Sequence, residues 1–336
     1  MAIQKRPIKI LATADWHIGK RRGPVLDGVN LRERDTERCI EALLETAETE
    51  KPDITMISGD LIDVAGTHSE RGHHEERTVF WAISKLAGCS KSVVVLRGTP
   101  NHDGKEFFLA LSDYCMQFSN VSIIMEPCIA RTEFMDIVCI PGFDVGYFRA
   151  KFAGLSREEE NEAFSAELGN LCMGLREACR TGFPTALMAH YTVPGCNMES
   201  GQNTFMQKFE PVLTLESLHA ADYDLVCLGH IHRPQKLPNV PNAFYAGAVN
   251  ALNFNDEGQE RGFYIHEYED RMHIESRFVE TPYRKFLTIK LDVDDIGQIN
   301  HGALDMVAAA KWAGKVKDKI VRVFYDSTKE DKKALN

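Results

Sequence analysis

Five short groups of residues with metal-binding side chains lie far apart along the chain, each shortly after an apolar run. They are Asp15-Trp16-His17, Gly59-Asp60, Asn101-His102-Asp103, His190 and Gly229-His230-Ile231-His232. Carboxylate, imidazole and amide groups are side chains with which proteins bind divalent metal ions. Two such ions about 4 Å apart can bind the oxygens of a phosphate ester, generate hydroxide and stabilise the leaving oxygen. The residue types therefore predict a two-metal site that hydrolyses phosphoesters.

The spacing within the groups indicates how two ions would share these ligands. Two cations so close need a bridging anion, and Asp60, which follows a glycine that permits a tight turn, is the candidate bridge. Asp15 and His17 lie two residues apart, so they point the same way if strand geometry persists, and both can bind one ion. Asn101 and His190 are the neutral candidates for the other ion.

His230 and His232 are also two residues apart, and one of them can bind each ion. Mixed carboxylate and imidazole ligation suits Mn²⁺ or Fe²⁺ better than Mg²⁺, which prefers oxygen ligands, although Zn²⁺ or Ni²⁺ could also occupy such a site. We therefore expect two divalent cations, with Mn²⁺ as the first candidate.

The apolar runs before these groups are typical of buried strands. They span residues 8–14, 54–58, 93–97, 186–189 and 225–228. All are short and rich in Val, Ile and Leu, as are strands covered on both faces. Helical patterns alternate with them, which predicts an α/β fold. Because ligands bind beyond the carboxyl ends of strands in such sheets, the five groups are expected to meet at one edge.

Composition fits a protein with a large core. The chain has 336 residues, of which 44% are hydrophobic and 26% charged. No apolar stretch approaches the roughly 18 residues that a membrane span needs, so we expect no membrane association and a cytoplasmic location. The nine cysteines are scattered, without a C-x-x-C pair, and are expected to be reduced.

The net charge of −10 argues against non-specific binding of nucleic acid over the whole surface, but it leaves room for a local basic track. Lys20, Arg21 and Arg22 directly follow the first group, and Arg97 and Lys105 flank the third. The run from Lys20 to Arg22 is either a solvated loop or a set of contacts to DNA phosphates. Its position beside an acidic strand end favours the phosphate contacts.

From Thr281 onward the chain changes character. A half-buried strand is expected over residues 286–293, a helix near His301 to Ala313 and a second strand over residues 320–325. This pattern predicts two domains, a catalytic domain over residues 1–280 and a small appendage over residues 281–336. About 55 residues are marginal for an independent core, so the appendage should pack on the catalytic domain or on another chain.

The ordered set of groups resembles the pattern of the calcineurin-like metallophosphoesterases, which is D-x-H, G-D, G-N-H-(D/E), H and G-H-x-H. The resemblance covers about residues 8–270 and implies a two-sheet β-sandwich flanked by helices, here followed by a small α+β appendage of the capping type. It implies that one metal is held by Asp15, His17, Asp60 and His232, and the other by Asp60, Asn101, His190 and His230. It also implies that His102 binds neither metal and acts on the substrate. Asp103 is expected to orient His102, since catalytic imidazoles commonly need a carboxylate partner.

Further stretches resemble the Mre11/SbcD branch of DNA repair nucleases. They are residues 10–20 (ILATADWHIGK), 229–234 (GHIHRP), 244–248 (FYAGA), 262–263 and 281–286 (TPYRKF). This branch implies a homodimer that works on DNA with an SMC-like ATPase of the Rad50/SbcC type. It implies Mn²⁺-dependent 3′ to 5′ exonuclease activity on duplex DNA and endonuclease activity on single strands or hairpins. The chain stops soon after Lys332-Lys333, and this compactness resembles bacteriophage versions, with a truncated partner interface as the alternative expectation.

Two alternatives remain open at this point. A small-molecule phosphoesterase acting on nucleotides or lipid phosphates would use the same metals but would need a closed pocket. A non-catalytic scaffold of the same fold would usually have lost ligand positions, whereas every position here holds a suitable side chain. One departure from the family pattern concerns the third group, where Thr99-Pro100 stands between Gly98 and Asn101.

Overall fold

The computed structural model describes residues 7–20, 23–63, 72–142, 151, 154–197, 213–238, 240, 242–269, 271–291 and 314–325. Contacts between residues divide the chain into two units. The first unit comprises Met1–Asn250 and Glu260–Tyr283, and the second comprises Ala251–Gln259 and Arg284–Asn336. Within the described residues, no helix combines the length and the apolar character needed to cross a lipid bilayer.

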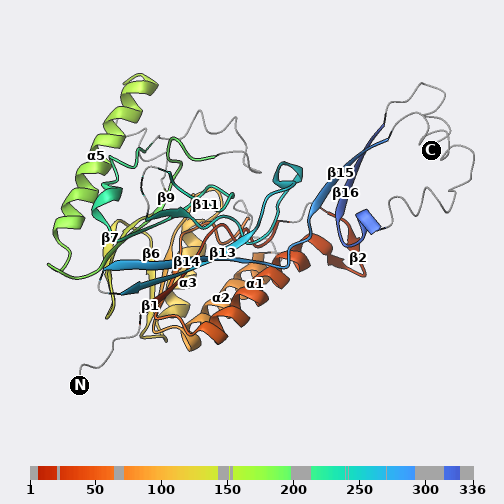
Figure 1. Ribbon diagram of the computed structural model, residues 1–336, viewed down its shortest axis with the longest axis horizontal. Helices are drawn as coiled ribbons and strands as arrows, with labels where there is room; N and C mark the ends of the chain where they lie inside the picture. Colours follow the sequence, from red (N-terminus) through yellow and green to blue (C-terminus); the bar gives the residue numbers. More distant parts are fainter. Residues whose placement is uncertain are drawn as a thin grey trace, which may run out of the picture. The chain divides into compact units, whose positions relative to one another are not determined.

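The first unit contains a six-stranded sheet in the order β14-β13-β1-β4-β5-β6 (Figure 1). Its strands are β1 (Ile8–Thr13), β4 (Ile54–Ile57), β5 (Ser92–Leu96), β6 (Val121–Ile124), β13 (Gly262–Glu269) and β14 (Met272–Glu280). β1, β4, β5 and β6 run parallel, whereas β13 pairs antiparallel with both β1 and β14. The carboxyl ends of the four parallel strands therefore lie at the same edge.

A second six-stranded sheet has the order β11-β12-β10-β9-β8-β7. Its strands are β7 (Cys128–Arg131), β8 (Asp136–Ile140), β9 (Thr185–His190), β10 (Leu225–Gly229), β11 (Gln235–Lys236) and β12 (Ala243–Tyr245). β8, β9, β10 and β12 are parallel, and the two outermost strands pair antiparallel with their neighbours. Each sheet thus has a parallel centre with at least one antiparallel edge strand.

The two sheets pack face to face, because alternate residues of their strands share one core. Ile10 and Met56 of the first sheet meet Met188 and Cys227 of the second in a cluster of buried side chains. The opposite faces are also buried, which explains why the strands are nearly continuous apolar runs rather than alternating ones. A β-sandwich with both outer faces covered results.

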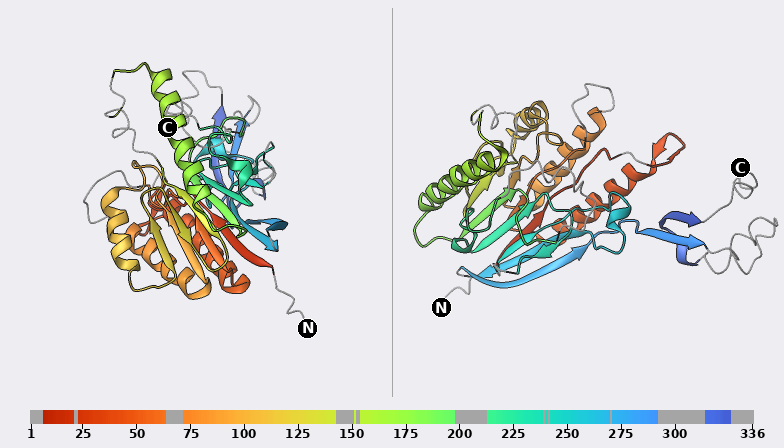
Figure 2. Two further views of the ribbon diagram at one scale, coloured as in Figure 1. Left: turned by 90° about the vertical axis from the view of Figure 1, so that its left-hand side faces the viewer. Right: turned by 90° about the horizontal axis from the view of Figure 1, so that it is seen from above.

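Helices cover the outer faces of this sandwich (Figure 2). Those described are α1 (Leu31–Glu50), α2 (Gly72–Cys89), α3 (Lys105–Cys115) and α5 (Arg157–Glu177). α2 packs against β5, α3 against β6 and α5 against β8. On α5, Phe164 and Leu168 join Val138 and Leu187 in a second buried cluster. The predicted class, a two-sheet sandwich flanked by helices, is confirmed.

The second unit holds a parallel pair of strands, β15 (Phe286–Leu291) and β16 (Ile320–Tyr325), as predicted. The one-turn 3₁₀ helix η2 (Phe254–Asp256) packs on them, with the rings of Phe254 and Phe286 4.6 Å apart between centroids. The predicted helix near residues 301–313 lies outside the described residues. The proposed boundary between residues 280 and 281 stays a prediction.

Candidate metal centre

Five strand ends deliver the predicted groups to one place, and they come from both sheets. β1, β4 and β5 precede the first three groups, while β9 ends in His190 and β10 directly precedes His230. The two edges touch at Gly229, where an added Cβ would lie 2.0 Å from the carbonyl oxygen of Ser58 and 2.7 Å from His190 Nδ1. Only a glycine lets the two strand ends approach this closely.

The backbone is unusual at four predicted ligands. Asp15, His17, Asp60 and His230 have φ angles of 52°, 45°, 55° and 92°, in the region that side chains other than glycine rarely adopt. Such strain persists only where the surroundings impose it, and it is concentrated at functional sites. Here the loops are pinned by hydrogen bonds from Asp15 N to Gly59 O (2.9 Å) and from His17 N to Asp60 O (3.1 Å).

The first ligand group contains Asp15, His17 and His232, whose candidate ligand atoms all lie within 4.8 Å of one another. The Nε2 atoms of His17 and His232 are 3.0 Å apart, close to the separation of two nitrogens bound at about 2.1 Å and a right angle to one ion. Burial and the neighbouring His17 hold the pKa of His232 well below its usual value. The imidazole is therefore neutral, which is the form that binds metals.

The second ligand group contains Asp60, His190 and His230, again within 4.8 Å of one another. His190 donates from Nδ1 to the carbonyl of Ser58 at 2.6 Å, which leaves Nε2 to face the group. Nε2 is buried and faces Asp60 Oδ2 at 3.2 Å, in the position from which both would bind one ion. Metal-binding histidines usually have this arrangement, with the second ring nitrogen fixed by a carbonyl or carboxylate.

Asp60 belongs to the second group and also faces His17 of the first. Its Oδ2 is 3.2 Å from His190 Nε2 and 4.0 Å from His17 Nε2, while Oδ1 accepts hydrogen bonds from Thr99 N at 2.7 Å and Thr99 Oγ1 at 3.0 Å. Burial alone would raise the pKa of this carboxyl, but the imidazoles of His190 and His102 hold it well below its usual value. An ionised carboxylate in this place fits the role of bridge between two divalent cations.

Asn101 is the predicted ligand with the least contact to the cluster. Its side chain is exposed in the turn after Thr99-Pro100, and the nearby contact to Asp60 comes from Thr99 instead. Its assignment as a metal ligand stays a prediction.

His102 faces a carboxylate that the sequence analysis did not single out. Its Nδ1 is 2.9 Å from Oδ1 of Asp63, which is also 3.7 Å from His17 Nδ1. Burial alone would lower the pKa of His102, but the carboxylates of Asp60 and Asp63 outweigh it and hold the pKa above its usual value. Only the position of Asp63 in the sequence could have indicated this contact. Asp63 stands three residues after Asp60, in a loop that pairs with the segment after the first group through Ile18 and Ile62.

The expectation that Asp103 orients His102 stays a prediction, and within the described residues the hydrogen bonds of the Asp103 carboxylate are to the backbone rather than to the imidazole ring. This buried carboxylate accepts hydrogen bonds from the backbone N–H groups of Asp60 (2.8 Å), Leu61 (2.9 Å), Ile62 (3.4 Å) and Gly98 (2.7 Å). Asp103 therefore fixes the shape of the two loops that carry Asp60 and His102. Burial and the nearby Asp60 carboxylate raise its pKa to about 7.

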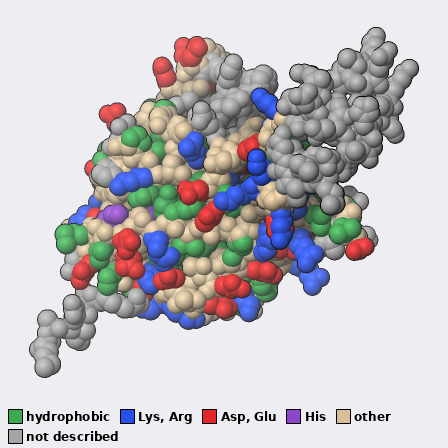
Figure 3. All heavy atoms as spheres, turned by 45° about the vertical axis from the view of Figure 1, so that its right-hand side comes forward, with side chains coloured by type: hydrophobic (Ala, Val, Ile, Leu, Met, Phe, Trp, Pro, Cys, Tyr) green, Lys and Arg blue, Asp and Glu red, His purple; other side chains and the backbone are tan. Residues whose placement is uncertain are grey.

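Lys20 is occupied within the site, since its ammonium lies 2.9 Å from Oδ2 of Asp63. Arg21 and Arg22, the other predicted DNA contacts, lie outside the described residues. The net charge of the chain is −10. On the face drawn in Figure 3, however, basic and acidic side chains are interspersed, so this face is not uniformly acidic.

Known proteins share this pattern. Residues 8–234, more than half of the chain, match the family described as calcineurin-like phosphoesterase. The chain is 25% identical over 303 residues to SbcD, a component of the SbcCD nuclease of Staphylococcus epidermidis, and the match covers 87% of this chain and 74% of that protein. The predicted resemblance to the Mre11/SbcD branch is thereby confirmed.

Similar solved structures include the phosphopantetheinyl hydrolase of Mycobacterium tuberculosis, at 14% identity and a TM-score of 0.40 over 73% of this chain and 90% of that one. A dimetal phosphatase from Danio rerio is 11% identical, with a TM-score of 0.42 over 82% of this chain and 100% of that one. From the family match, with the ligand groups described above, the chain belongs to the calcineurin-like phosphoesterase family.

Proposed function

We propose that the protein is a metal-dependent DNA nuclease of the Mre11/SbcD type. In this proposal it degrades duplex DNA from 3′ to 5′, cuts single strands or hairpins, and acts as a homodimer with an SMC-like ATPase of the Rad50/SbcC type. The observation that carries the proposal is the pair of adjacent ligand groups, one of which contains Asp60 as the candidate bridge to the other. The similarity to a nuclease component along most of the chain supports DNA as the substrate.

The residues present fit two divalent cations, with Mn²⁺ as the proposed metal. Bound there, the ions would bind non-bridging phosphate oxygens and provide hydroxide near neutral pH. One ion would be held by Asp15, His17, Asp60 and His232, and the other by Asp60, Asn101, His190 and His230.

The protein's own contribution to the reaction comes from His102. Because Asp63 contacts Nδ1 at 2.9 Å, the ring is held in place, and in its protonated form it donates a proton from Nε2 to the leaving oxygen. Asp103 keeps the loops beneath this histidine in place. The buried ligands are held without rearrangement, which is the condition for electrostatic stabilisation of a transition state.

The test is hydrolysis of end-labelled duplex DNA and of bis(p-nitrophenyl) phosphate by the purified protein with Mn²⁺, with and without a candidate ATPase. Asp60→Asn should lose both activities by about 10²-fold or more and bind less metal, because a neutral amide cannot compensate two dications. Asp113→Asn, an exposed carboxylate on α3, is the control. A fully active Asp60→Asn protein with two metals would contradict the assignment, and hydrolysis of the small diester without any cleavage of DNA would favour a small-molecule phosphoesterase.

A further inference from the structure

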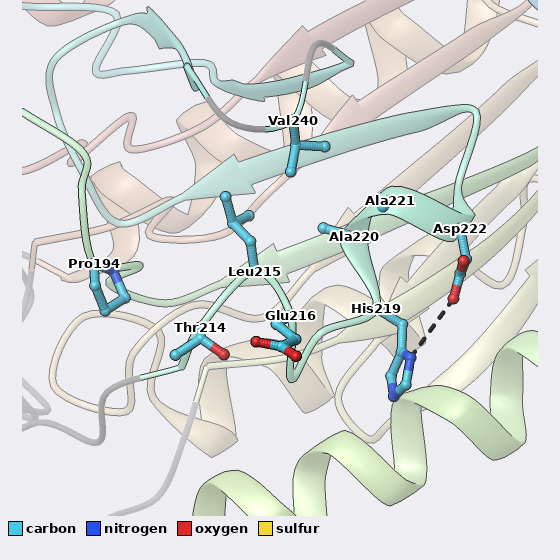
Figure 4. Close-up of a pocket in the computed structure, with 9 residues that line it drawn as sticks. All are labelled: Pro194, Thr214, Leu215, Glu216, His219, Ala220, Ala221, Asp222 and Val240. Carbon is cyan, nitrogen blue, oxygen red and sulfur yellow. Dashed lines mark ion pairs between the residues drawn. The ribbon is translucent and has the colours of Figure 1, made fainter.

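Cavities of similar size occur in three places on the first unit. One, of about 550 Å³, lies beside η1 (Ala220–Asp222) and is lined partly by the carboxylates of Glu216 and Asp222 (Figure 4). His219 is 3.6 Å from the Asp222 carboxylate in it. A second cavity, of about 540 Å³, includes Ile8 and Asp53 at the amino ends of the strands, away from the metal centre. The first cavity has two acidic lining residues and no Lys or Arg among the residues that line it, and the second lies at the opposite strand ends, so neither suits the substrate strand.

The third cavity, which we call the strand-end cavity, has a volume of about 520 Å³ and lies at the same edge as the metal centre. Its lining comes from the segments after β5, β6, β8 and β9 and from α5. Its charged lining residues are Arg97, Lys105 and Lys151 on the basic side and Glu126 and Glu167 on the acidic side, and its apolar lining includes Met125, Phe164, Leu171 and Tyr191. Ligands of α/β sheets bind at carboxyl edges of this kind.

Arg97 and Lys105 are positioned on either side of the loop that carries His102. Arg97 immediately precedes Gly98, and its Nε donates to the carbonyl of Asp103 at 2.8 Å, so the stem of the side chain is fixed. Among the described residues, neither the terminal nitrogens of Arg97 nor the Lys105 ammonium has a hydrogen-bond or ion-pair partner. Within the described part of the chain, both cations can therefore face an anion beside the reacting phosphate.

Apart from Glu126 and the ion pair between Lys151 and Glu167, the rest of the lining is apolar. Phe164 and Tyr191 are 5% and 6% exposed, with ring centroids 6.2 Å apart. Tyr191 also donates from its hydroxyl to the carbonyl of Pro141 at 2.8 Å, which fixes the ring. Leu171, at 38% exposure, forms part of the rim. Phe164 and Tyr191 thus back the wall. A flat, apolar group such as a nucleobase gains from contact with the wall's more exposed apolar residues, Met125, Pro127 and Leu171.

We propose that the strand-end cavity binds the nucleotide next to the scissile phosphodiester. The neighbouring phosphate lies against Arg97 and Lys105, and the base lies against the wall formed with α5. The inference rests on the proposed nuclease function and specifies how the substrate strand leaves the metal centre. Binding through apolar and phosphate contacts is tolerant of sequence.

The test uses the full chain with Mn²⁺ and two substrates, a short single-stranded oligonucleotide and bis(p-nitrophenyl) phosphate, which has no neighbouring nucleotide. The variants are Lys105→Glu and Leu171→Glu. Lys105→Glu places an acid in the first turn of α3, where it does not oppose the helix dipole. Their matched controls are Lys236→Glu on β11 and Met173→Glu on α5, both exposed residues that do not line the cavity.

Each cavity variant should lower kcat/KM for the oligonucleotide about tenfold, mainly through KM, and the loss for the small diester should be severalfold smaller. For Lys105→Glu, the salt dependence of oligonucleotide affinity should become shallower by about 0.7 in log–log slope, because one single-strand phosphate contact is lost. Equal losses on both substrates, or values equal to those of the controls, would overturn the proposal. A wild-type protein that hydrolyses only the small diester would instead refute the nuclease function, and this subsite with it.

Discussion

At the scale of single residues, the least expected feature of the site is the pairing of Asp63 with His102. Asp63→Asn should keep both metals and lower kcat about 10- to 100-fold, because the imidazole loses the carboxylate that holds its proton. His102→Ala should lose about 10²-fold or more, also with metals retained. Metal content and steady-state kinetics measure both effects.

A double variant separates positioning from independent action. If Asp63 acts only through His102, then Asp63→Asn should cost little further activity in the His102→Ala protein. Fully additive losses would show that Asp63 acts on the metals or the substrate directly.

The residues that the sequence predicted and those it missed differ in one physical respect. Asp15, Asp60 and His190 follow strands, and strand ends can be recognised from the apolar runs before them. Asp63 and Asp103 act through loop contacts, and the partner of a loop carboxylate depends on backbone geometry that no periodicity encodes. For this reason the backbone contacts of Asp103 could not be predicted from the sequence.

At the scale of elements, the contact between the two strand ends can be tested at Gly229. Gly229→Ala should weaken metal binding and destabilise the protein by about 1 to 3 kcal/mol, because its Cβ would meet the backbone oxygen of Ser58 at 2.0 Å. Gly88→Ala is the matched control, since nothing lies within 4 Å of its added Cβ in α2, and it should be neutral or slightly stabilising. Denaturant unfolding and metal titration measure both variants.

The pH dependence of stability has an identifiable contributor in β13. His266 is fully buried beside Phe244 and Tyr264, with Nδ1 2.6 Å from Ser276 Oγ. Burial, with a smaller effect of His273, lowers its pKa to about 3. The folded protein keeps this ring neutral while the unfolded chain takes up a proton below about pH 6.5, so stability falls as the pH drops from there towards 3.

Between pH 7.5 and pH 5 this residue should therefore cost about 2 kcal/mol of unfolding free energy. His266→Phe should reduce the pH dependence over that interval by a similar amount, measured by urea unfolding at both values. His74→Gln, which removes an imidazole with 55% side-chain exposure, serves as the reference. An unchanged pH dependence in His266→Phe would contradict the prediction.

The central strands were predictable because each is buried on both faces and has a clear run of Val, Ile and Leu. The short strands β7 and β11 and the hairpin formed by β2 (Val25–Leu26) and β3 (Val29–Asn30) were not predicted. Two to four residues at a sheet edge show no periodicity, and partners elsewhere in the chain decide their pairing. The sequence likewise did not predict which of the five groups belongs to which sheet, since sequence alone does not assign strands to sheets.

At the scale of the whole molecule, we predict a homodimer in solution, formed through the helical regions 32–50 and 75–87. The second unit is expected to contact DNA and the ATPase. Thr281 donates to the carbonyl of Val249 at 2.5 Å within the first unit, so a truncation should begin after Tyr283. Deletion of residues 284–336 should retain metal-dependent hydrolysis of bis(p-nitrophenyl) phosphate but lose processive duplex digestion and ATPase coupling.

Light scattering and paired nuclease assays on the full and truncated chains test this prediction. A strictly monomeric full-length protein would count against it. So would a truncated form that digests duplex DNA as well as the full chain does.

The contact between His17 and His232 joins residues 215 positions apart. Eight of the twelve strands of the two large sheets must therefore be synthesised before the second partner of that pair exists. Until then the nascent chain lacks His230 and His232, and neither ligand group is complete. The metal centre can form only during the last third of synthesis, after both sheets have begun to assemble.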